Sequence, residues 1–404
     1  MKEQNDEPQP AAVAAATPPK QAGEARDPWW WVERGVWTEP RKLSGLTRLT
    51  TSESANRVWF ALVDKTLAPA NLQSALQKVW QNGGSAGADE QTVAHFARHA
   101  EKELQRLHEQ LRDGTYEPQP VRRAWIPKPG SNDKRPLGIP AVRDRIVQGA
   151  LRHVLEPIFE TEFALPREIV CDDSLCAAPV SISRGEHSYG FRPGRGAKDA
   201  LRRVDTLLKA GHEWVVDADL KSYFDTIPHE RLLALMKQRV ADGRVLALVE
   251  SFLRAGVLEE SKGWQPTERG TPQGGVISPL LANLYLNPLD HQMERAGREM
   301  VRYADDFVIL CRREAEAHAA LEAVRAWVSE AGLTLHPEKT RVVNATQPGG
   351  FDFLGYHFER GLRWPRKKSL AKLKDRLRAK TARLDAPSAA CADGKMSFLA
   401  PAPG

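Results

Sequence analysis

Apolar residues recur along this chain at helical spacing in several segments. A period of three to four residues predicts an amphipathic helix, and a glycine just after such a stripe predicts its end. One stripe lies in residues 93–111 and is followed by Gly114. A second lies in residues 199–211 and ends at Gly211. The apolar positions of the first stripe are Val93, Phe96, Ala97, Ala100, Leu104, Leu107 and Leu111.

Short apolar runs separated by turn residues predict strands. Residues 122–140 place two such runs around a turn rich in Pro, Gly, Ser and Asn, which predicts a β-hairpin with a basic tip. Farther along, the pattern predicts further elements in the order β-α-β-β-α-β, which is the split βαβ arrangement of an α/β protein. These are a strand at 213–220, a helix from about His229, a hairpin at 300–311, a helix at 315–330 and a strand at 340–344.

Two adjacent carboxylates interrupt the predicted hairpin, in the sequence VRYADDFVIL (301–310). If YADD forms the turn, Asp305 and Asp306 lie at its tip. Asp217 and Asp219 are two residues apart in the neighbouring strand, so their side chains point to the same face. Crowded carboxylates are costly unless cations neutralise them, and oxygen ligands of this kind suit Mg²⁺. A solvated turn is the ordinary alternative for an isolated Asp-Asp pair.

Composition adds little to this picture. The chain has 404 residues, 58 basic and 52 acidic, for a net charge of +6, and this mild excess is compatible with a polyanionic partner. Four scattered cysteines favour a reducing compartment. No apolar run approaches the roughly 20 residues that a membrane span needs. A cytoplasmic protein without a membrane segment is therefore expected, with a low-complexity N-terminal extension over residues 1–45.

Longer blocks of the sequence resemble the successive motifs of bacterial group II intron reverse transcriptases. The resemblance runs from about Trp59 to Arg383. The blocks are RPLGIPAVRDRIVQGAL, SYGFRPGRGAKDALRRV, VVDADLKSYFDTIPH, RGTPQGGVISPLLANLYLNPLD, VRYADDFVIL, GLTLHPEKTRVV and FDFLGYHF.

This resemblance implies an α/β right-hand polymerase with fingers, a βαββαβ palm and a partial helical thumb. The implied boundaries are fingers at 46–163, an insertion at 164–187, a palm at 188–345, a primer grip and the start of a basic thumb at 346–384, and a divergent tail at 385–404.

The family motifs also imply roles for individual residues. Asp219, Asp305 and Asp306 match the catalytic aspartates that bind two Mg²⁺ ions, with Mn²⁺ as a possible substitute, and the Leu220 carbonyl completes a metal shell. Asp217 is not at a motif position. The residues that match nucleotide-binding positions are Lys128 and Arg135 on the triphosphate, Phe224 under the incoming sugar and Gln273 near the nucleotide and template. The nucleic-acid contacts that the resemblance suggests are Arg192, Arg195, Lys339, Arg366, Lys367 and Lys368.

Some of these roles have plainer alternatives. Phe224 is equally a candidate for the palm core, with Tyr223 pointing outward. Lys339 matches a palm lysine proposed to protonate pyrophosphate, and a solvated lysine is the alternative. Arg192 and Arg195 are also candidates for solvated loop arginines. The thumb segment is more specific, because residues 360–384 hold eleven basic residues against one acid and keep one helical face apolar.

The sequence departs from the family pattern in two places. The insertion contains Cys171, Cys176 and His187, whose spacing is poor for a zinc site, so a surface loop is expected. After Arg383 the family continues into a helical maturase region, whereas residues 384–404 show no helical stripe. That difference puts intron splicing in doubt.

The expected function is RNA-directed DNA synthesis. The expected partners are an RNA template of group II intron type, a DNA primer and dNTPs, and the oligomeric state is open. Three alternatives remain: an RNA-binding splicing cofactor with an idle polymerase, an RNA-templated RNA polymerase, and a degenerate copy without activity. Phe224 argues against the RNA polymerase, because a bulky ring there obstructs the ribose 2′-hydroxyl.

Overall fold

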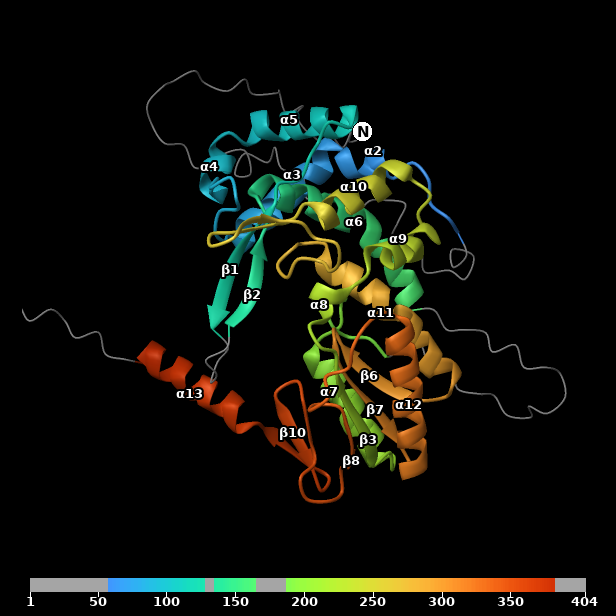
Figure 1. Ribbon diagram of the computed structural model, residues 1–404. Coiled ribbons are helices and arrows are strands. Elements are labelled where there is room, and N and C mark those ends of the chain that lie inside the picture. Colours follow the sequence, from blue (N-terminus) through green and yellow to red (C-terminus); the bar gives the residue numbers. More distant parts are fainter. Residues whose placement is uncertain (1–56, 128–133, 165–186, 382–404) are drawn as a thin grey trace, which may run out of the picture. The chain divides into compact units, whose positions relative to one another are not determined.

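The computed structural model describes residues 57–127, 134–164 and 187–381, all of which lie in one compact unit, Pro40–Gly404 (Figure 1). Lys128 and the rest of the hairpin tip lie outside the described residues. So do the predicted N-terminal extension, the divergent tail and nearly all of the insertion. Among the described helices, none combines the length and the apolar character that crossing a membrane requires.

Helices form one part of the fingers. They are α2 (Val63–Leu67), α3 (Pro69–Asn82), α4 (Val93–Arg98), α5 (Ala100–Asp113) and α6 (Val142–Ala164). The single helix predicted over 93–111 is in fact two helices, because the backbone breaks at His99, where φ is −117°. Gly114 ends α5 in the left-handed conformation at φ 72°, which confirms the predicted stop.

A four-stranded sheet completes the fingers, in the order β2-β1-β4-β5. Strands β1 (Val121–Pro127) and β2 (Lys134–Ile139) form the predicted antiparallel hairpin. Strand β4 (Val257–Glu259) runs parallel to β1 and pairs with β5 (Gly263–Gln265). Segments that are far apart in the sequence therefore meet beside the hairpin.

The palm contains the predicted βαββαβ sheet. Its strands are β3 (Trp214–Asp219), β6 (Glu299–Tyr303), β7 (Asp306–Cys311) and β8 (Arg341–Asn344). The order is β6-β7-β3-β8 and every pairing is antiparallel, so the hairpin lies beside the first strand as predicted. Helices α7 (Ala197–Lys209) and α12 (Glu314–Glu330) pack on this sheet (Figure 1).

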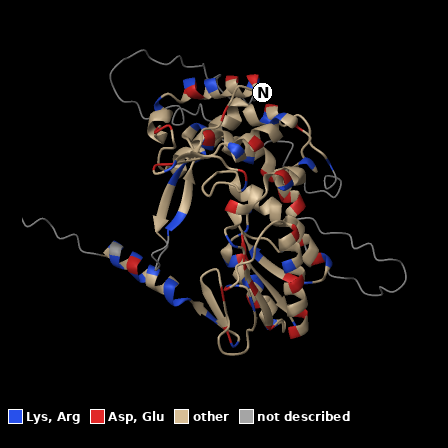
Figure 2. Ribbon diagram, viewed as in Figure 1, with Lys and Arg blue, Asp and Glu red and all other residues tan. Residues whose placement is uncertain are grey.

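The remaining helices connect the sheets. They are α8 (Tyr223–Thr226), α9 (His229–Lys237), α10 (Gly243–Arg254) and α11 (Ser278–Arg295). The chain then forms a small sheet of β9 (Phe351–Phe353), β10 (Tyr356–Glu359) and β11 (Leu362–Pro365), followed by α13 (Lys367–Thr381). Basic side chains dominate α13, as Figure 2 shows, and its leucines 370, 373 and 377 are exposed. The predicted basic amphipathic helix is thus confirmed as a helix.

Candidate active site

Three carboxylates meet at one end of the palm sheet. Asp219, the last residue of β3, is directly opposite Asp306, the first residue of β7. Asp305 occupies the turn between β6 and β7, next to Asp306. Asp217 lies two residues before Asp219, on the same face of β3. The predicted position of the Asp-Asp pair at the hairpin turn is therefore confirmed.

The charges of these carboxylates oppose one another. Burial raises the pKa of Asp306 to about 7, and the negative charges of Asp217, Asp219 and Asp305 add to that rise. Burial also raises the pKa of Asp305, with Asp219 contributing. The pKa of Asp217 rises to about 6 because of burial, although Arg341 lies 3.6 Å away and opposes the rise. Without a cation, this end of the sheet therefore disfavours full ionisation.

The donor set fits a hard divalent cation. Carboxylate oxygens are the ligands that Mg²⁺ prefers, and their mutual repulsion is the condition that a cation relieves. One positive charge is already present, since Lys339 Nζ donates a hydrogen bond of 2.5 Å to Asp219 Oδ2. In the described part of the chain, no three acidic, His or Cys side chains are close enough to hold an ion as they stand. An ion bound through Asp219 Oδ2 would compete with Lys339 for that oxygen.

The backbone around Leu220 is compatible with its predicted role. Leu220 forms an isolated antiparallel bridge with Leu335. The two hydrogen bonds of this bridge join the Lys221 amide to the Thr334 carbonyl and the His336 amide to the Asp219 carbonyl, each at 2.8 Å. Neither bond uses the Leu220 carbonyl, and metal ligation by that oxygen stays a prediction.

A buried arginine fixes the turn that carries Asp305. Arg302 is fully buried and donates to both carboxylate oxygens of Asp290 on α11. It also donates to Asn283 Oδ1 at 3.0 Å and to the carbonyl of Ala304 at 2.9 Å. Ala304 has a φ of 60°, a conformation that non-glycine residues seldom adopt. In the sequence Arg302 is a basic residue within a short, mainly apolar strand, and the local pattern does not indicate its partner.

A glycine packs directly against this turn. A Cβ atom on Gly190 would lie 2.5 Å from the amide nitrogen of Ala304, so no other residue fits there without a shift. The Gly190 carbonyl in turn accepts a hydrogen bond of 2.8 Å from Asn283 Nδ2. Since Asn283 also binds Arg302, one hydrogen-bonded network lies on the buried side of the turn that carries Asp305.

Two of the predicted nucleotide-binding residues, Arg135 and Gln273, lie on β2 and on the segment before α11. Arg135, on β2, is exposed and is close enough to Asp305 to oppose the rise in that carboxylate's pKa. The Gln273 carbonyl accepts a 2.6 Å hydrogen bond from the Gly138 amide. Gly274 has a φ of 117°, and a Cβ there would lie 2.2 Å from the Gly138 carbonyl oxygen. Gly274 therefore allows a close approach of its backbone to Gly138, and contact of the Gln273 side chain with a nucleotide stays a prediction.

The burial of Tyr223 and Phe224 bears on the alternative in which Phe224 belongs to the palm core and Tyr223 points outward. Tyr223 is 1% exposed, and its hydroxyl donates a 2.6 Å hydrogen bond to the Ala282 carbonyl. Phe224 is only partly buried, at the start of the short helix that follows β3. The alternative is therefore wrong in placing Tyr223 outside, whereas the half-buried Phe224 does not decide between the two interpretations. Contact of Phe224 with the incoming sugar stays a prediction.

The comparison with known proteins agrees with this geometry. A family model for reverse transcriptase (RNA-dependent DNA polymerase) matches residues 126–358. The chain belongs to the reverse transcriptase family. It is 35% identical over 298 residues to protein YkfC of Escherichia coli (strain K12), covering 64% of this chain and 71% of YkfC.

Two further similarities mark the extent of the match. The group II intron-encoded protein LtrA of Lactococcus lactis subsp. cremoris is 36% identical over 244 residues, covering 59% of this chain and 36% of LtrA. The chain thus spans about a third of the length of LtrA. A partial Cas6-RT-Cas1–Cas2 complex is similar in structure at a TM-score of 0.40 and 23% identity, covering 67% of this chain and 41% of that one. Reverse transcriptases as a family use divalent metal ions.

In this reverse transcriptase, Arg192 does not have the predicted role of an RNA contact. Its side chain is 1% exposed and makes hydrogen bonds of 2.6 to 3.2 Å with the Glu160 carboxylate. It also donates to the Ser188 carbonyl at 3.0 Å and lies over the Phe163 ring. Arg192 therefore ties α6 to the start of the palm. Arg195 shares the Ser188 carbonyl, at 3.3 Å, and its contact with RNA stays a prediction.

Arg366 connects the thumb helix to the preceding sheet. Its guanidinium lies 3.2 Å from Asp352, and its amide donates to the Gly355 carbonyl at 3.0 Å. The next two residues, Lys367 and Lys368, are exposed at the start of α13. They are free to meet a phosphate backbone, whereas Arg366 is already engaged within the protein.

His187, the last residue of the insertion, belongs to the palm. It is buried, and its Nδ1 lies 2.9 Å from the Met300 carbonyl oxygen. Its carbonyl accepts from the Arg302 amide at 2.6 Å. Cys171 and Cys176, the other members of the considered zinc set, lie outside the described residues.

Proposed function

We propose that this chain is an RNA-directed DNA polymerase of the group II intron type. The observation that carries the proposal is the pairing of Asp219 with Asp306 across β3 and β7, with Asp305 in the adjoining turn. Repulsion among these carboxylates makes it costly to ionise all of them at this end of the sheet, and a bound cation would relieve that repulsion. A cluster of mutually repelling carboxylates with raised pKa values is typical of a catalytic site rather than of a structural one.

Asp219, Asp305 and Asp306 would hold two Mg²⁺ ions or, as a substitute, Mn²⁺, with help from the Leu220 carbonyl. Such ions supply activation of the primer 3′-hydroxyl and stabilisation of the leaving oxygen in phosphoryl transfer. The protein contributes the positions of these oxygens, which Arg302 holds through the turn. The family membership supports the use of divalent ions.

The other residues bind and orient the substrates. Arg135, together with Lys128, binds the triphosphate of the incoming dNTP, because a guanidinium fork and a point charge both suit phosphate oxygens. The ring of Phe224 lies against the deoxyribose and excludes a 2′-hydroxyl. Lys339, once released from Asp219, holds a proton at Nζ that the leaving pyrophosphate can accept.

The nucleic-acid partners are an RNA template and a DNA primer. The similarity to the intron-encoded protein LtrA favours group II intron RNA as the template. The basic side chains of α13, including Lys367 and Lys368, would follow the backbone of the template–primer duplex. Such contacts release counterions, so binding should weaken steeply as salt rises.

Primer extension tests this proposal. Purified full-length protein is given an RNA template, a DNA primer, Mg²⁺ and dNTPs, and is compared with the Asp305→Asn variant. The variant should lose nucleotide addition by at least about 100-fold, the scale on which losses of transition-state stabilisation fall. RNA affinity, measured by filter binding, should change little. Asp113→Asn, on exposed α5, serves as the matched control.

Substantial extension by Asp305→Asn would reject the site assignment. Extension by neither protein, with intact binding of intron RNA, would instead favour the splicing cofactor. Extension with rNTPs in place of dNTPs would favour the RNA polymerase.

A further inference from the structure

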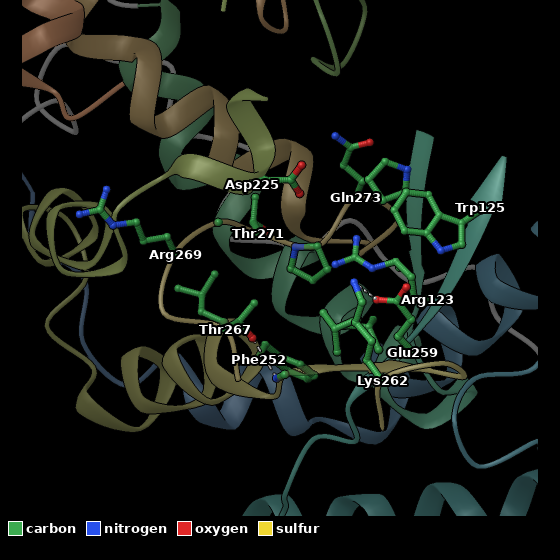
Figure 3. Close-up of a pocket in the computed structure, with 18 residues that line it drawn as sticks. Arg123, Trp125, Asp225, Phe252, Glu259, Lys262, Thr267, Arg269, Thr271 and Gln273 are labelled. Atoms are coloured by element: carbon green, nitrogen blue, oxygen red, sulfur yellow. Dashed lines mark hydrogen bonds and ion pairs between the residues drawn. The ribbon is translucent and has the colours of Figure 1, made fainter. Parts of the chain in front are cut away.

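A cavity of about 340 Å³ lies in the fingers, between the β1–β2 hairpin and the segment that leads to Gln273 (Figure 3). Its lining includes neither Asp219 nor Asp305 nor Asp306. It also lacks Arg135 and Phe224, but it includes Gln273, which the family motifs place near the nucleotide and template. The cavity therefore adjoins the proposed polymerase site at Gln273 and lies apart from its carboxylates.

The alternation of strand residues builds one wall. Val121, Arg123 and Trp125 are at every second position of β1, so their side chains share one face, and all three line the cavity. Across the hairpin, Arg123 is opposite Gly138 and Trp125 is opposite Pro136. A Cβ on Gly138 would lie 3.3 Å from Pro272 Cβ and 3.4 Å from Val121 Cβ, so the glycine lets β2 pack closely against these two lining residues.

Arg123 has an unmet hydrogen-bonding need in this cavity. Its Nε atom is buried and has no hydrogen-bond partner. The guanidinium extends into the middle of the cavity (Figure 3). Asp225 is near enough for Arg123 to lower its pKa, yet no ion pair joins the two within 4.0 Å. A buried, unpartnered guanidinium nitrogen is costly, and an anionic ligand would satisfy it.

Two other features favour a nucleotide as that ligand. Trp125 is 49% exposed at the cavity edge, so its indole presents a face on which a base can stack. Arg123 supplies the guanidinium inside the cavity, since the Arg269 side chain points away from it (Figure 3) and Lys262 is already paired with Glu259 at 3.7 Å. A phosphate near Arg123 and an aromatic base near Trp125 would both be accommodated, since a cavity of this volume lies in the range of small-ligand sites.

We propose that this cavity is a second nucleotide-binding site, in which Arg123 binds a phosphate and Trp125 stacks on the base. The nucleotide is either free or an unpaired residue of a bound RNA. The Gly138 amide, at the floor of the cavity, donates to the Gln273 carbonyl at 2.6 Å, so a ligand here would contact the segment that approaches the polymerase site. The site does not depend on the catalytic carboxylates.

Equilibrium binding to the full-length protein tests the proposal. The probes are AMP and the single-stranded RNA pentamer of adenosine, each radiolabelled, in excess EDTA so that no divalent ion loads the carboxylates. Arg123→Gln should weaken binding by about 10-fold or more, as expected for a charge-assisted hydrogen bond. Trp125→Ala should weaken it by about 5- to 150-fold, the range for loss of one base stack.

Two further variants make the result specific. Arg106→Gln removes an exposed arginine of α5 outside the cavity and should bind as the wild type does. Arg123→Lys keeps the charge and should bind with intermediate affinity, which separates loss of the anion contact from loss of folding. Binding of AMP alone identifies a free nucleotide as the ligand, and binding of the pentamer alone identifies an RNA residue.

Equal affinity of Arg123→Gln and Arg106→Gln would overturn the proposal, as would the lack of saturable binding of either probe by the wild type. Primer extension is measured on the same preparations. A protein that extends primers but binds neither probe rejects this site alone. A protein that binds a probe through Arg123 but does not extend rejects the polymerase proposal alone.

Discussion

The β6–β7 hairpin carries two groups of charged residues whose electrostatic surroundings differ. At Arg302 the charge is fully buried and meets a carboxylate, an amide oxygen and a backbone carbonyl. Three residues later, burial raises the pKa values of Asp305 and Asp306, and neighbouring carboxylates add to the rise. The two groups lie on the same short segment, so the local fold alone does not account for the difference.

The difference separates a structural charge from a functional one. A buried ion pair with complete hydrogen bonding holds a unique arrangement, here the turn at Ala304. Carboxylates that repel one another destabilise the folded protein, and such a cost persists where a ligand or a reaction needs it. We therefore expect substitutions that remove a charge to lower the stability of the folded protein at the Arg302 ion pair and to raise it at the repelling carboxylates.

The largest expected effect on stability is at Arg302. Arg302→Met should lower the free energy of unfolding by about 3–5 kcal/mol, because it leaves Asp290 buried without a partner. Urea unfolding followed by circular dichroism measures the loss. The double variant Arg302→Met/Asp290→Leu should recover most of it, since an apolar pair can replace a buried ion pair. A single variant as stable as the wild type would show that the pair does not hold the turn.

The next effect concerns Asp144, a buried carboxylate whose hydrogen bonds offset only part of the cost of burying its charge. Asp144 accepts hydrogen bonds from the Tyr116 hydroxyl at 2.5 Å and from the Gln119 amide at 3.0 Å. Burial nevertheless raises its pKa to about 6, while the Tyr116 hydrogen bond opposes the rise. The folded protein therefore holds this proton more tightly than the unfolded chain does. Its stabilising contribution is present below about pH 4 and is lost as the pH rises through about 6.

Asp144→Asn cannot ionise and should lack this loss. The stability of the variant relative to the wild type should improve by about 2–3 kcal/mol between pH 4 and pH 7, following from a pKa difference of about two units. Urea unfolding at both pH values measures it, and the value at pH 4 reports the cost of the substitution itself. An unchanged difference between the two pH values would mean that Asp144 has the same pKa in the folded protein as in the unfolded chain.

A smaller and more selective effect is expected at Phe224. Phe224→Val should keep dNTP addition within about tenfold and raise the ratio of kcat/KM for rNTP over dNTP by roughly 5- to 150-fold, the equivalent of about 1–3 kcal/mol of clash and desolvation. Single-nucleotide insertion of ATP and dATP on an RNA template gives the ratio, and a thermal melt checks the fold. An unchanged ratio would remove Phe224 from the nucleotide site.

Much of the palm could be predicted from the sequence because its signals are local. Alternating and helical periods gave β3, the β6–β7 hairpin and α12, and adjacent aspartates placed the turn. The break between α4 and α5 at His99 was not predicted, because the apolar stripe continues across it.

The charge pairs could not be predicted in this way, because the partner is set by packing and not by spacing. Arg192 has the same basic side chain whether it faces RNA or Glu160, which is 32 residues away in sequence and on another helix. Arg302 depends likewise on Asp290 and Asn283, one element earlier. The cavity around Arg123 needs β1, β2 and the segment before Gln273 to come together, which no single motif indicates.

The most direct test of this account compares Asp306→Asn with Asp290→Asn by urea unfolding at pH 8. In EDTA, Asp306→Asn should be more stable than the wild type by about 1–3 kcal/mol because it removes a repelled charge, whereas Asp290→Asn should be less stable because it weakens the partner of Arg302. Addition of Mn²⁺ should stabilise the wild type and abolish the advantage of Asp306→Asn. Equal destabilisation by both substitutions in EDTA, with no response to Mn²⁺, would contradict the distinction between structural and functional charge on this hairpin.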